Sequence, residues 1–387
     1  VVSSISAKLS KNIGRSRDIY ASTRVSHADE IDATYDFSRY HLAEKPNIYL
    51  IFVESYGSVL YKRDDYRLAY EALLHELEPQ LQEAGLSATT ALSESPTWGG
   101  GSWMAYTSAL FGLRIEEHPS YLALVDAYQE RDYPDLGNYL QSQGYRYSRV
   151  SSLSTELKDE VWALYKNFFG VDAWLQYRDL GYVGERYGWG PAPPDQYVLN
   201  FADAAGREAT DSPRLLFFIT QNSHYPWMPL PELADDWQSL NVPAPDQEAI
   251  PDDELEHATR RRNYFNAIEY ELRFLTDFII QHEDENAIFV LVGDHQPPRV
   301  SRRADGWDTP MHIISRDADF VSSFEEYGFV NGLVVEDIQS AIRHEGFYTM
   351  FLRQLLANYG VTPEDRPPYL PNGLMLSEID DSSTPKN

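Results

Sequence analysis

The stretch NIYLIFVESYG, residues 47–57, decides the fold that this chain is expected to adopt. Its centre, residues 48–53, is an apolar run too continuous for a strand with one face in water. Such runs are typical of parallel strands that are buried on both faces. Residues 215–219 (LLFFI) and 287–292 (AIFVLV) have the same character, and residues 311–314 (MHII) form a shorter fourth run. The four runs are therefore predicted to be strands of one mostly parallel sheet.

Helical patterns separate these runs. Residues 254–281 repeat apolar side chains at spacings of three and four, and residues 135–140 open a shorter helix. Gly144 ends that helix before a strand-like segment at 146–150. Strands that alternate with helices predict an α/β fold, with a doubly wound, mostly parallel sheet and helices on both faces.

The chain divides into three predicted regions. Residues 1–45 are polar and lack sustained periodicity, which indicates an N-terminal arm or linker. Residues 46–360 contain all the predicted strands and are expected to form one catalytic domain. Residues 361–387 are rich in Pro, Asp and Ser, and we expect a C-terminal tail that wraps the surface or frays.

The composition narrows the class of protein. The 387 residues include 32 basic and 60 acidic side chains, and the net charge is −28. Such a surface repels phosphate backbones, so no nucleic-acid partner is expected. It also repels anionic lipid surfaces unless a basic patch or a membrane anchor overrides the repulsion. The absence of cysteine excludes disulfides, thiolate zinc sites and cysteine nucleophiles.

Apolar segments long enough for a membrane are missing from this sequence. It has no run of 18 apolar residues and no signal-peptide pattern, and it begins with Val1. We interpret it as a monomeric soluble domain whose upstream membrane helices are not part of the sequence. A full-length reading frame without apolar spans would contradict this expectation.

Polar side chains follow three of the predicted strands. Glu54 follows the first run, residues 221–224 (QNSH) follow the second, and Asp294 and His295 follow the third. The carboxyl ends of parallel strands meet at one edge of a sheet, where ligands bind. A carboxylate at the end of a buried strand is costly unless it is paired or bound to a metal, and adjacent Asp and His side chains can bind one divalent cation. A solvated loop acid and a turn Asp beside a surface His remain alternatives.

A glycine-rich turn carries the candidate nucleophile. Gly99-Gly100-Gly101 precedes Ser102, and residues 103–110 can run on as a helix. A hydroxyl at a helix N-terminus lies in a positive field beside free N–H groups, which favours both an alkoxide and a phosphoryl oxygen. The same pattern suits a plain N-cap, and Thr97 is a rival nucleophile.

Several residues are candidates for substrate binding. His224 can contact phosphate oxygens or protonate a leaving group, although it also suits an aromatic loop. Trp162 and Lys166 lie on a predicted helix, where aromatic residues at helical spacing are more often core. Thr97 is a further candidate, and His312 either faces the pocket or belongs to the core.

Together the motifs resemble the alkaline phosphatase/sulfatase superfamily. The likeness is to its membrane-anchored branch of lipoteichoic acid synthases, phosphoethanolamine transferases and periplasmic glucan phosphoglycerol transferases. It covers residues 47–360 and rests on NIYLIFVESYG, GGGSWMAYTSALFGL, TQNSHYPW and VLVGDHQPP, in the family's order. The resemblance implies one divalent metal ion, Zn²⁺ or Mn²⁺, and a histidine on the substrate phosphate, here His224. The implied metal ligands are Glu54, Ser102, Asp294 and His295.

Departures from the family pattern refine this resemblance. The family nucleophile is usually Thr, but the distance from Ser102 to the Phe111-Gly112-Leu113 end of the helix matches the family, whereas Thr97 would need an insertion. The C/S-x-P-x-R signature of sulfatases is absent after Ser102, so sulfatase activity is not expected. A second metal site would need another Asp and two His, for which Asp253 and His257 are weak candidates.

The resemblance implies a function. We expect transfer of a phosphoglycerol-type or phosphoethanolamine-type head group from a phospholipid to a glycan or lipid acceptor, through a phosphoserine at Ser102. The expected location is extracytoplasmic, in the periplasm or at the outer face of the inner membrane. One alternative is a phosphodiesterase or phosphatase that uses water as the acceptor. The other is a catalytically degenerate binding module.

Overall fold

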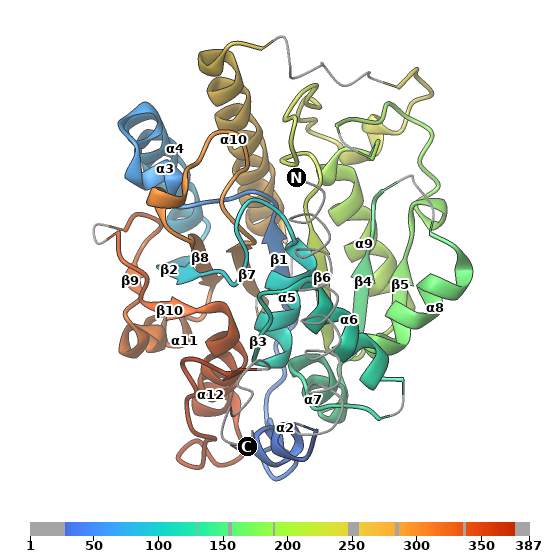
Figure 1. Ribbon diagram of the computed structural model, residues 1–387, viewed down its shortest axis with the longest axis vertical. Helices are drawn as coiled ribbons and strands as arrows, with labels where there is room; N and C mark the ends of the chain where they lie inside the picture. The colour runs from blue at the N-terminus through green and yellow to red at the C-terminus, as the bar shows by residue number, and fades with distance from the viewer. Residues whose placement is uncertain are drawn as a thin grey trace, which may run out of the picture.

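The computed structural model describes residues 28–129, 131–153, 157–188, 190–246, 255–282, 286–335 and 338–375. In this part of the chain nine strands form one sheet, in the order β10-β2-β8-β7-β1-β6-β4-β5, with β9 beside β2 (Figure 1). The strands are β1 (Ile48–Val53), β2 (Ser87–Glu94), β4 (Arg146–Val150), β5 (Ala173–Leu175), β6 (Arg214–Ile219), β7 (Ile288–Gly293), β8 (Asp308–Ser315), β9 (Val330–Asn331) and β10 (Ile342–Arg343).

The centre of the sheet is parallel, as the apolar runs predict. β1 lies between β6 and β7 and is parallel to both, with Ile48 opposite Leu215 on one side and Ile288 on the other. All six residues of β1 are buried, because β1 has a helical layer on each face. β4 continues the parallel part beyond β6, and β5 follows β4.

The prediction for the fourth apolar run is wrong in direction. The run lies in β8, which is antiparallel to both β7 and β2. A parallel return needs a long crossover, usually a helix, whereas residues 294–307 contain only the 3-10 turn η4 (Arg303–Asp305). β2 was missed altogether because its sequence, SATTALSE, is mostly small and polar.

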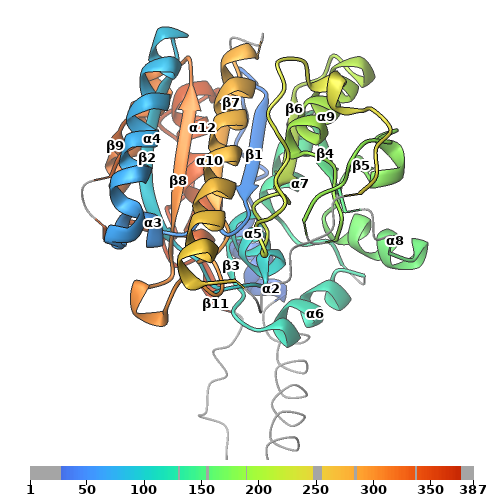
Figure 2. The same cartoon turned by 90° about the horizontal axis from the view of Figure 1, so that it is seen from above.

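Helices cover both faces of the sheet, which confirms the doubly wound α/β class. Along β1, alternate side chains face opposite layers: Leu50 and Phe52 pack in one core cluster, and Tyr49 and Ile51 in the other. Figure 2 shows α4 and α10 on one side of the sheet and α12 on the other. The first layer contains α2 (Ala28–Tyr35), α5 (Ser102–Phe111), α6 (His118–Ala127), α7 (Leu136–Ser142) and α12 (Phe347–Tyr359); the second contains α3 (Val59–Lys62), α4 (Asp64–Glu83), α9 (Asp195–Ala209) and α10 (His257–Gln281).

Two further helices and a two-stranded sheet are present in the described part of the chain. α8 (Asp159–Phe168) lies next to β5, and α11 (Ala318–Ser322) packs on β2 and β8. β3 (Leu113–Arg114) pairs with β11 (Leu374–Met375), so part of the predicted tail adds a strand. None of the helices in the described ranges combines the length and apolarity needed to cross a membrane.

The predicted arm or linker over residues 1–45 needs correction where the structure describes it. α2 and the segment after it pack into the core through Ile31, Tyr35 and Phe37. Tyr35 donates a hydrogen bond to the carbonyl of Gly112, at the end of α5. Because these aromatic residues follow no regular period, the sequence pattern did not reveal that they are buried.

Candidate active site

The carboxyl ends of β1 and β7 bring the three strand-end ligand candidates together. Val53 lies opposite Gly293 in the parallel register, so Glu54 and Asp294 leave the sheet side by side. One ligand atom each of Glu54, Asp294 and His295 lies within 4.8 Å of the others, and all three residues are buried. Gly293 is required here, because a Cβ at this position would lie 1.9 Å from the carbonyl oxygen of Tyr56.

Asp294 presents one unused oxygen to this cluster. Its Oδ1 accepts hydrogen bonds from the backbone N–H groups of Ser55, at 2.7 Å, and His295, at 2.6 Å. Its Oδ2 is buried, has no hydrogen-bond partner and lies 3.4 Å from His295 Nε2. A buried carboxylate oxygen without a donor is unfavourable, and it is the arrangement expected of a metal ligand.

His295 is also oriented as expected for a metal ligand. Its Nδ1–H donates to the carbonyl of Gln296 at 2.9 Å, which leaves the lone pair of Nε2 free. Nε2 lies 3.4 Å from Glu54 Oε1. A histidine fixed by a backbone carbonyl at one ring nitrogen, with the other nitrogen beside carboxylates, is typical of metal ligation. The three side chains therefore fit a divalent cation.

The pKa shifts in the cluster are also those expected at a cation-binding site. Burial raises the pKa of Asp294 well above its usual range, and the neighbouring Glu54 carboxylate raises it further. Burial also disfavours the charged form of Glu54, but His295 and His224 outweigh it and hold its pKa at about 2. Burial lowers the pKa of His295, against the raising effect of the Glu54 carboxylate. A bound cation would offset both carboxylate charges.

Ser102 is the first residue of α5 and reaches this cluster. Its Oγ donates to Glu54 Oε2 at 2.9 Å and lies 3.4 Å from His295 Nε2. The N-cap residue of α5 is Gly101, and no side chain caps the helix, so the capping interpretation of Ser102 is wrong. Gly99, Gly100 and Gly101 all have positive φ (69°, 137° and 84°), a conformation that glycine adopts without strain.

The rival hydroxyl of Thr97 lies elsewhere. Thr97 is 4 % exposed, and its N–H donates to Ser95 Oγ at 3.2 Å. Ser95 Oγ in turn donates to the carbonyl of Asp294 at 2.6 Å. The structure thus places Thr97 in the support of the glycine-rich turn, and its burial argues against the predicted substrate contact.

His224 lies on the loop after β6, at the same edge of the sheet. The first residue of this loop, Thr220, accepts a hydrogen bond from the N–H of Glu54 at 3.0 Å. His224 is partly exposed, its Nδ1–H donates to the carbonyl of Tyr225 at 2.7 Å, and it lies near enough to Glu54 to influence the pKa of that carboxylate. The third strand end therefore contributes a histidine beside the metal-ligand cluster.

A buried pair of acids that sequence reasoning missed supports this loop. Asp195, the first residue of α9, accepts hydrogen bonds at Oδ2 from the N–H groups of Gln221 and Asn222, both at 2.6 Å. Burial raises the pKa of Asp195 to about 7. Glu271 of α10 lies beside it, and burial together with the Asp195 charge raises its pKa well above the usual range. No local motif signals the pair, because α9 and α10 are far apart in the sequence.

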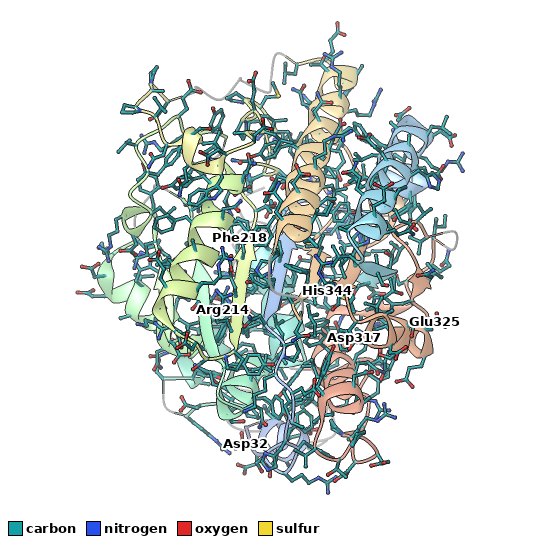
Figure 3. The ribbon with its side chains drawn as sticks, turned by 180° about the vertical axis from the view of Figure 1, so that it is seen from behind. Asp32, Arg214, Phe218, Asp317, Glu325 and His344 are labelled. Atoms are coloured by element: carbon teal, nitrogen blue, oxygen red, sulfur yellow. The ribbon has the colours of Figure 1, made fainter. Side chains whose placement is uncertain are left out.

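His344 is a second residue that the sequence did not single out. It lies near the centre of the molecule (Figure 3) and is fully buried. Its Nε2–H donates to the carbonyl of Gly293 at 3.1 Å, and its Nδ1 accepts from Ser93 Oγ at 2.8 Å. It thereby fixes the backbone immediately before Asp294.

One predicted substrate-binding residue, His312, is wrong, because its side chain is buried in the core. His312 lies in the middle of β8, with Nδ1 bonded to Thr90 Oγ1 and Nε2 to Tyr56 Oη, both at 2.8 Å. Burial lowers its pKa to about 3, and it is a hydrogen-bonded core histidine. Lys166 is exposed and lines a groove with Tyr128 and Asp132, whereas Trp162 lines a different, aromatic cavity.

The candidate second metal site has no support. Asp253 lies outside the described residues, and His257 is an exposed residue at the start of α10. Among the described residues, the cluster of Glu54, Asp294 and His295 is the one group of acids and histidines close enough to hold a metal ion. Together the sheet topology and this cluster define an α/β protein with a candidate metal-binding site and a glycine-rich turn at the carboxyl ends of its central strands.

Comparison with known proteins agrees with this class. The sulfatase family model matches residues 46–318, which is more than half of the chain. The chain therefore belongs to the sulfatase family, and it is an enzyme of the alkaline phosphatase superfamily, as its motifs predict. No curated protein shows significant sequence similarity to it.

Two solved structures with a TM-score of 0.50 share the fold. The zinc complex of the C-terminal periplasmic domain of EptC from Escherichia coli has a TM-score of 0.50 at 14% identity, and the match covers 86% of this chain and 89% of that one. The corresponding domain of the phosphoethanolamine transferase EptC from Campylobacter jejuni gives 0.50 at 11% identity, over 87% and 95%. The lipoteichoic acid synthase LtaP from Listeria monocytogenes gives 0.49 at 15%, over 74% and 71%.

Proposed function

We propose that this chain transfers a phosphoryl-linked head group from a phospholipid to a glycan or lipid acceptor, with Ser102 as the nucleophile. The observation that carries the proposal is the position of Ser102 Oγ. It lies 2.9 Å from Glu54 Oε2 and 3.4 Å from His295 Nε2, at the N-terminus of α5. A hydroxyl in that position donates a hydrogen bond to a carboxylate and lies in the positive field of the helix N-terminus. Both features favour its use as a nucleophile.

The residues that would hold a divalent cation, Zn²⁺ or Mn²⁺, are Glu54, Ser102, Asp294 and His295. When bound, the cation supplies Lewis acidity that lowers the pKa of the serine hydroxyl. Ser102 Oγ then forms a bond to phosphorus, the bond from phosphorus to the departing lipid alcohol breaks, and a phosphoserine results. His224 lies where it can hold a phosphate oxygen or give a proton to the departing oxygen. The hydroxyl oxygen of the acceptor then forms a bond to phosphorus, the bond from phosphorus to Ser102 Oγ breaks, and the acceptor's proton passes to Ser102 Oγ.

The donor class and the location are inferred from relatives. The two solved structures with a TM-score of 0.50 are periplasmic domains of EptC proteins, one of them named a phosphoethanolamine transferase and the other a complex with zinc. Their fold and the site geometry support an extracytoplasmic, membrane-anchored head-group transferase. All four implied metal ligands are present and lie close together, which argues against a degenerate binding module.

The test is intact-mass measurement after incubation with phospholipid vesicles and Zn²⁺ or Mn²⁺. Vesicles of phosphatidylglycerol and of phosphatidylethanolamine are used separately, so the mass of the adduct identifies the transferred group. We expect an adduct on the wild type and on Thr97→Ala, and none on Ser102→Ala. An adduct that survives in Ser102→Ala but is absent in Thr97→Ala would refute the assignment.

The same reaction separates transferase from hydrolase. If water is the acceptor, the head-group phosphate accumulates in solution at the same rate with and without an added acceptor. If the chain is a transferase, the adduct accumulates and turnover requires the acceptor. Steady release without acceptor would favour the phosphodiesterase alternative.

A further inference from the structure

A second site lies next to the nucleophile turn. An aromatic cavity of about 620 Å³ is lined by side chains of α5, α6, α8 and β5. Its walls are built mainly from seven aromatic residues: Trp103, Tyr106, Tyr121, Trp162, Tyr165, Phe169 and Trp174. A concave, aromatic-lined space of this size beside a catalytic residue is typical of a small-molecule subsite.

The cavity is continuous with the catalytic helix. Trp103 follows Ser102 directly, and Tyr106 lies four residues after Ser102, on the same face of α5. Tyr106 also lies close to Glu54. Burial raises the pKa of Tyr106, and the nearby Glu54 carboxylate raises it further. The cavity therefore adjoins the first turn of the helix that begins at Ser102.

A buried cation behind the cavity wall constrains the charge of the ligand. Arg149 of β4 is 2% exposed, and its guanidinium lies 3.9 Å from the ring centroid of Phe169 and 5.0 Å from those of Tyr106 and Trp174. All three rings line the cavity. Within the described residues no carboxylate forms an ion pair with Arg149. A cationic ligand would add a second positive charge to the same ring stack, so the cavity disfavours an ammonium group.

The lining also disfavours an anion or an alkyl chain. Among the described residues, no Asp, Glu, Lys or Arg lines the cavity, and Leu153 and Leu157 are the aliphatic side chains of its lining. Polar edges are present instead: Ser151 Oγ accepts a hydrogen bond from Trp174 Nε1 at 3.0 Å, which leaves its O–H available, and His118 lies at the rim. Ring faces with polar edges match a pyranose, whose C–H face carries partial positive charge and whose hydroxyls need partners.

We propose that this cavity binds a neutral sugar ring of the acceptor. The inference rests on the proposed function and narrows its acceptor to a glycan. A hydroxyl of the bound sugar forms the new bond to phosphorus as the bond from phosphorus to Ser102 Oγ breaks, and its proton passes to the serine oxygen. Trp162 is the binding residue that tests the idea, because it forms an edge-to-face pair with Trp174 at 5.1 Å and belongs to no part of the metal-ligand cluster.

The experiment measures binding separately from chemistry. The metal-loaded Ser102→Ala protein is titrated with maltose, cellobiose and gentiobiose, with 1-hexanol as an aliphatic probe and choline as a cationic one, by saturation-transfer NMR. We expect saturable binding of at least one disaccharide, with a Kd of about 1–10 mM, and no saturable binding of the other two probes. Adding Trp162→Ala or Trp162→Leu should weaken disaccharide binding at least about tenfold, and Trp162→Phe should weaken it much less.

Trp237→Ala is the matched control, because Trp237 packs on Tyr197 away from the cavity and its loss should leave sugar binding unchanged. Absence of saturable disaccharide binding, full binding by Trp162→Leu, or saturable binding of 1-hexanol or choline would each overturn the proposal. Ser102-dependent cleavage of the chromogenic diester bis(4-nitrophenyl) phosphate is measured in parallel. Cleavage without sugar binding rejects the sugar site alone, whereas sugar binding without cleavage rejects the proposed function alone.

Discussion

Replacing Asp294 by Asn should stabilise the metal-free protein and abolish its stabilisation by metal. Asp294 and Glu54 are buried carboxylates in one cluster, and Asp294 Oδ2 has no hydrogen-bond partner. In the Asn variant the side-chain oxygen can still accept hydrogen bonds from the N–H groups of Ser55 and His295. The new NH₂ group replaces the unpaired oxygen and can donate toward the Glu54 carboxylate. Relieving a buried group without a partner typically recovers about 1–3 kcal/mol.

The size of the metal effect follows from mass action. A cation at a hundred times its Kd stabilises the folded state by about 2.7 kcal/mol. With an unfolding entropy of about 2.1 cal/mol/K per residue, the 387-residue chain has about 0.8 kcal/mol/K in total, so the melting temperature should rise by about 3 °C. The same conversion gives Asp294→Asn a melting temperature about 1–4 °C above the wild type without metal.

Differential scanning calorimetry with EDTA, and again with excess Zn²⁺ or Mn²⁺, measures both effects. In EDTA, Asp294→Asn should have the higher melting temperature. With metal, only the melting temperature of the wild type should rise. Asp308→Asn is the control, because it removes an ion pair with Lys62 outside the site. It should melt lower than the wild type under both conditions and keep the metal shift. If Asp294→Asn melts below the wild type in EDTA, or retains the full metal shift, the reasoning is refuted.

Three further predictions concern the nucleophile, the acid pair and the strand end. Ser102→Ala should lower kcat at least about 10³-fold, whereas Thr97→Ala should stay within about tenfold, as measured by head-group release; equal losses would contradict the placement of the two hydroxyls. Burial raises the pKa of both Asp195 and Glu271 above their unfolded values, so their contribution to stability is full below about pH 4 and is lost as the pH rises through about 7 for Asp195. Glu271→Gln should therefore flatten the fall of melting temperature between about pH 4.5 and 8, and an unchanged slope would speak against the pair. Gly293→Ala should destabilise by at least about 3 kcal/mol in urea unfolding, because its Cβ would lie 1.9 Å from the Tyr56 carbonyl; a loss under about 1 kcal/mol would show that the backbone yields there.

Much of the site could be predicted because it follows from strand topology. Apolar runs such as residues 48–53 identify buried parallel strands, and parallel strands present their carboxyl ends at one edge. Glu54, Asp294 and His224 each follow such a run, so their meeting in space needed no knowledge of the loops. The structure confirms that the metal-ligand candidates converge.

The sequence did not predict strand direction or side-chain surroundings where these depend on residues distant along the chain. β8 has a strand-like sequence, but its direction depends on the loop that precedes it, and His312 is a core residue because β2 and Tyr56 close over it. Trp162 and Lys166 share one helix, yet α8 turns the first into the aromatic cavity and the second toward a separate groove.

The sequence by itself determined the fold class, the family and the three strand-end ligand candidates, because side-chain periodicity and strand order depend on local pattern. Spacing along the chain already favoured Ser102 over Thr97, but only the tertiary structure shows the Ser102 hydroxyl against Glu54. That contact depends on how the left-handed glycines direct the chain over the end of β1. The aromatic cavity is likewise a tertiary feature, since its walls come from elements spread between residues 103 and 190 that meet only after the chain has folded.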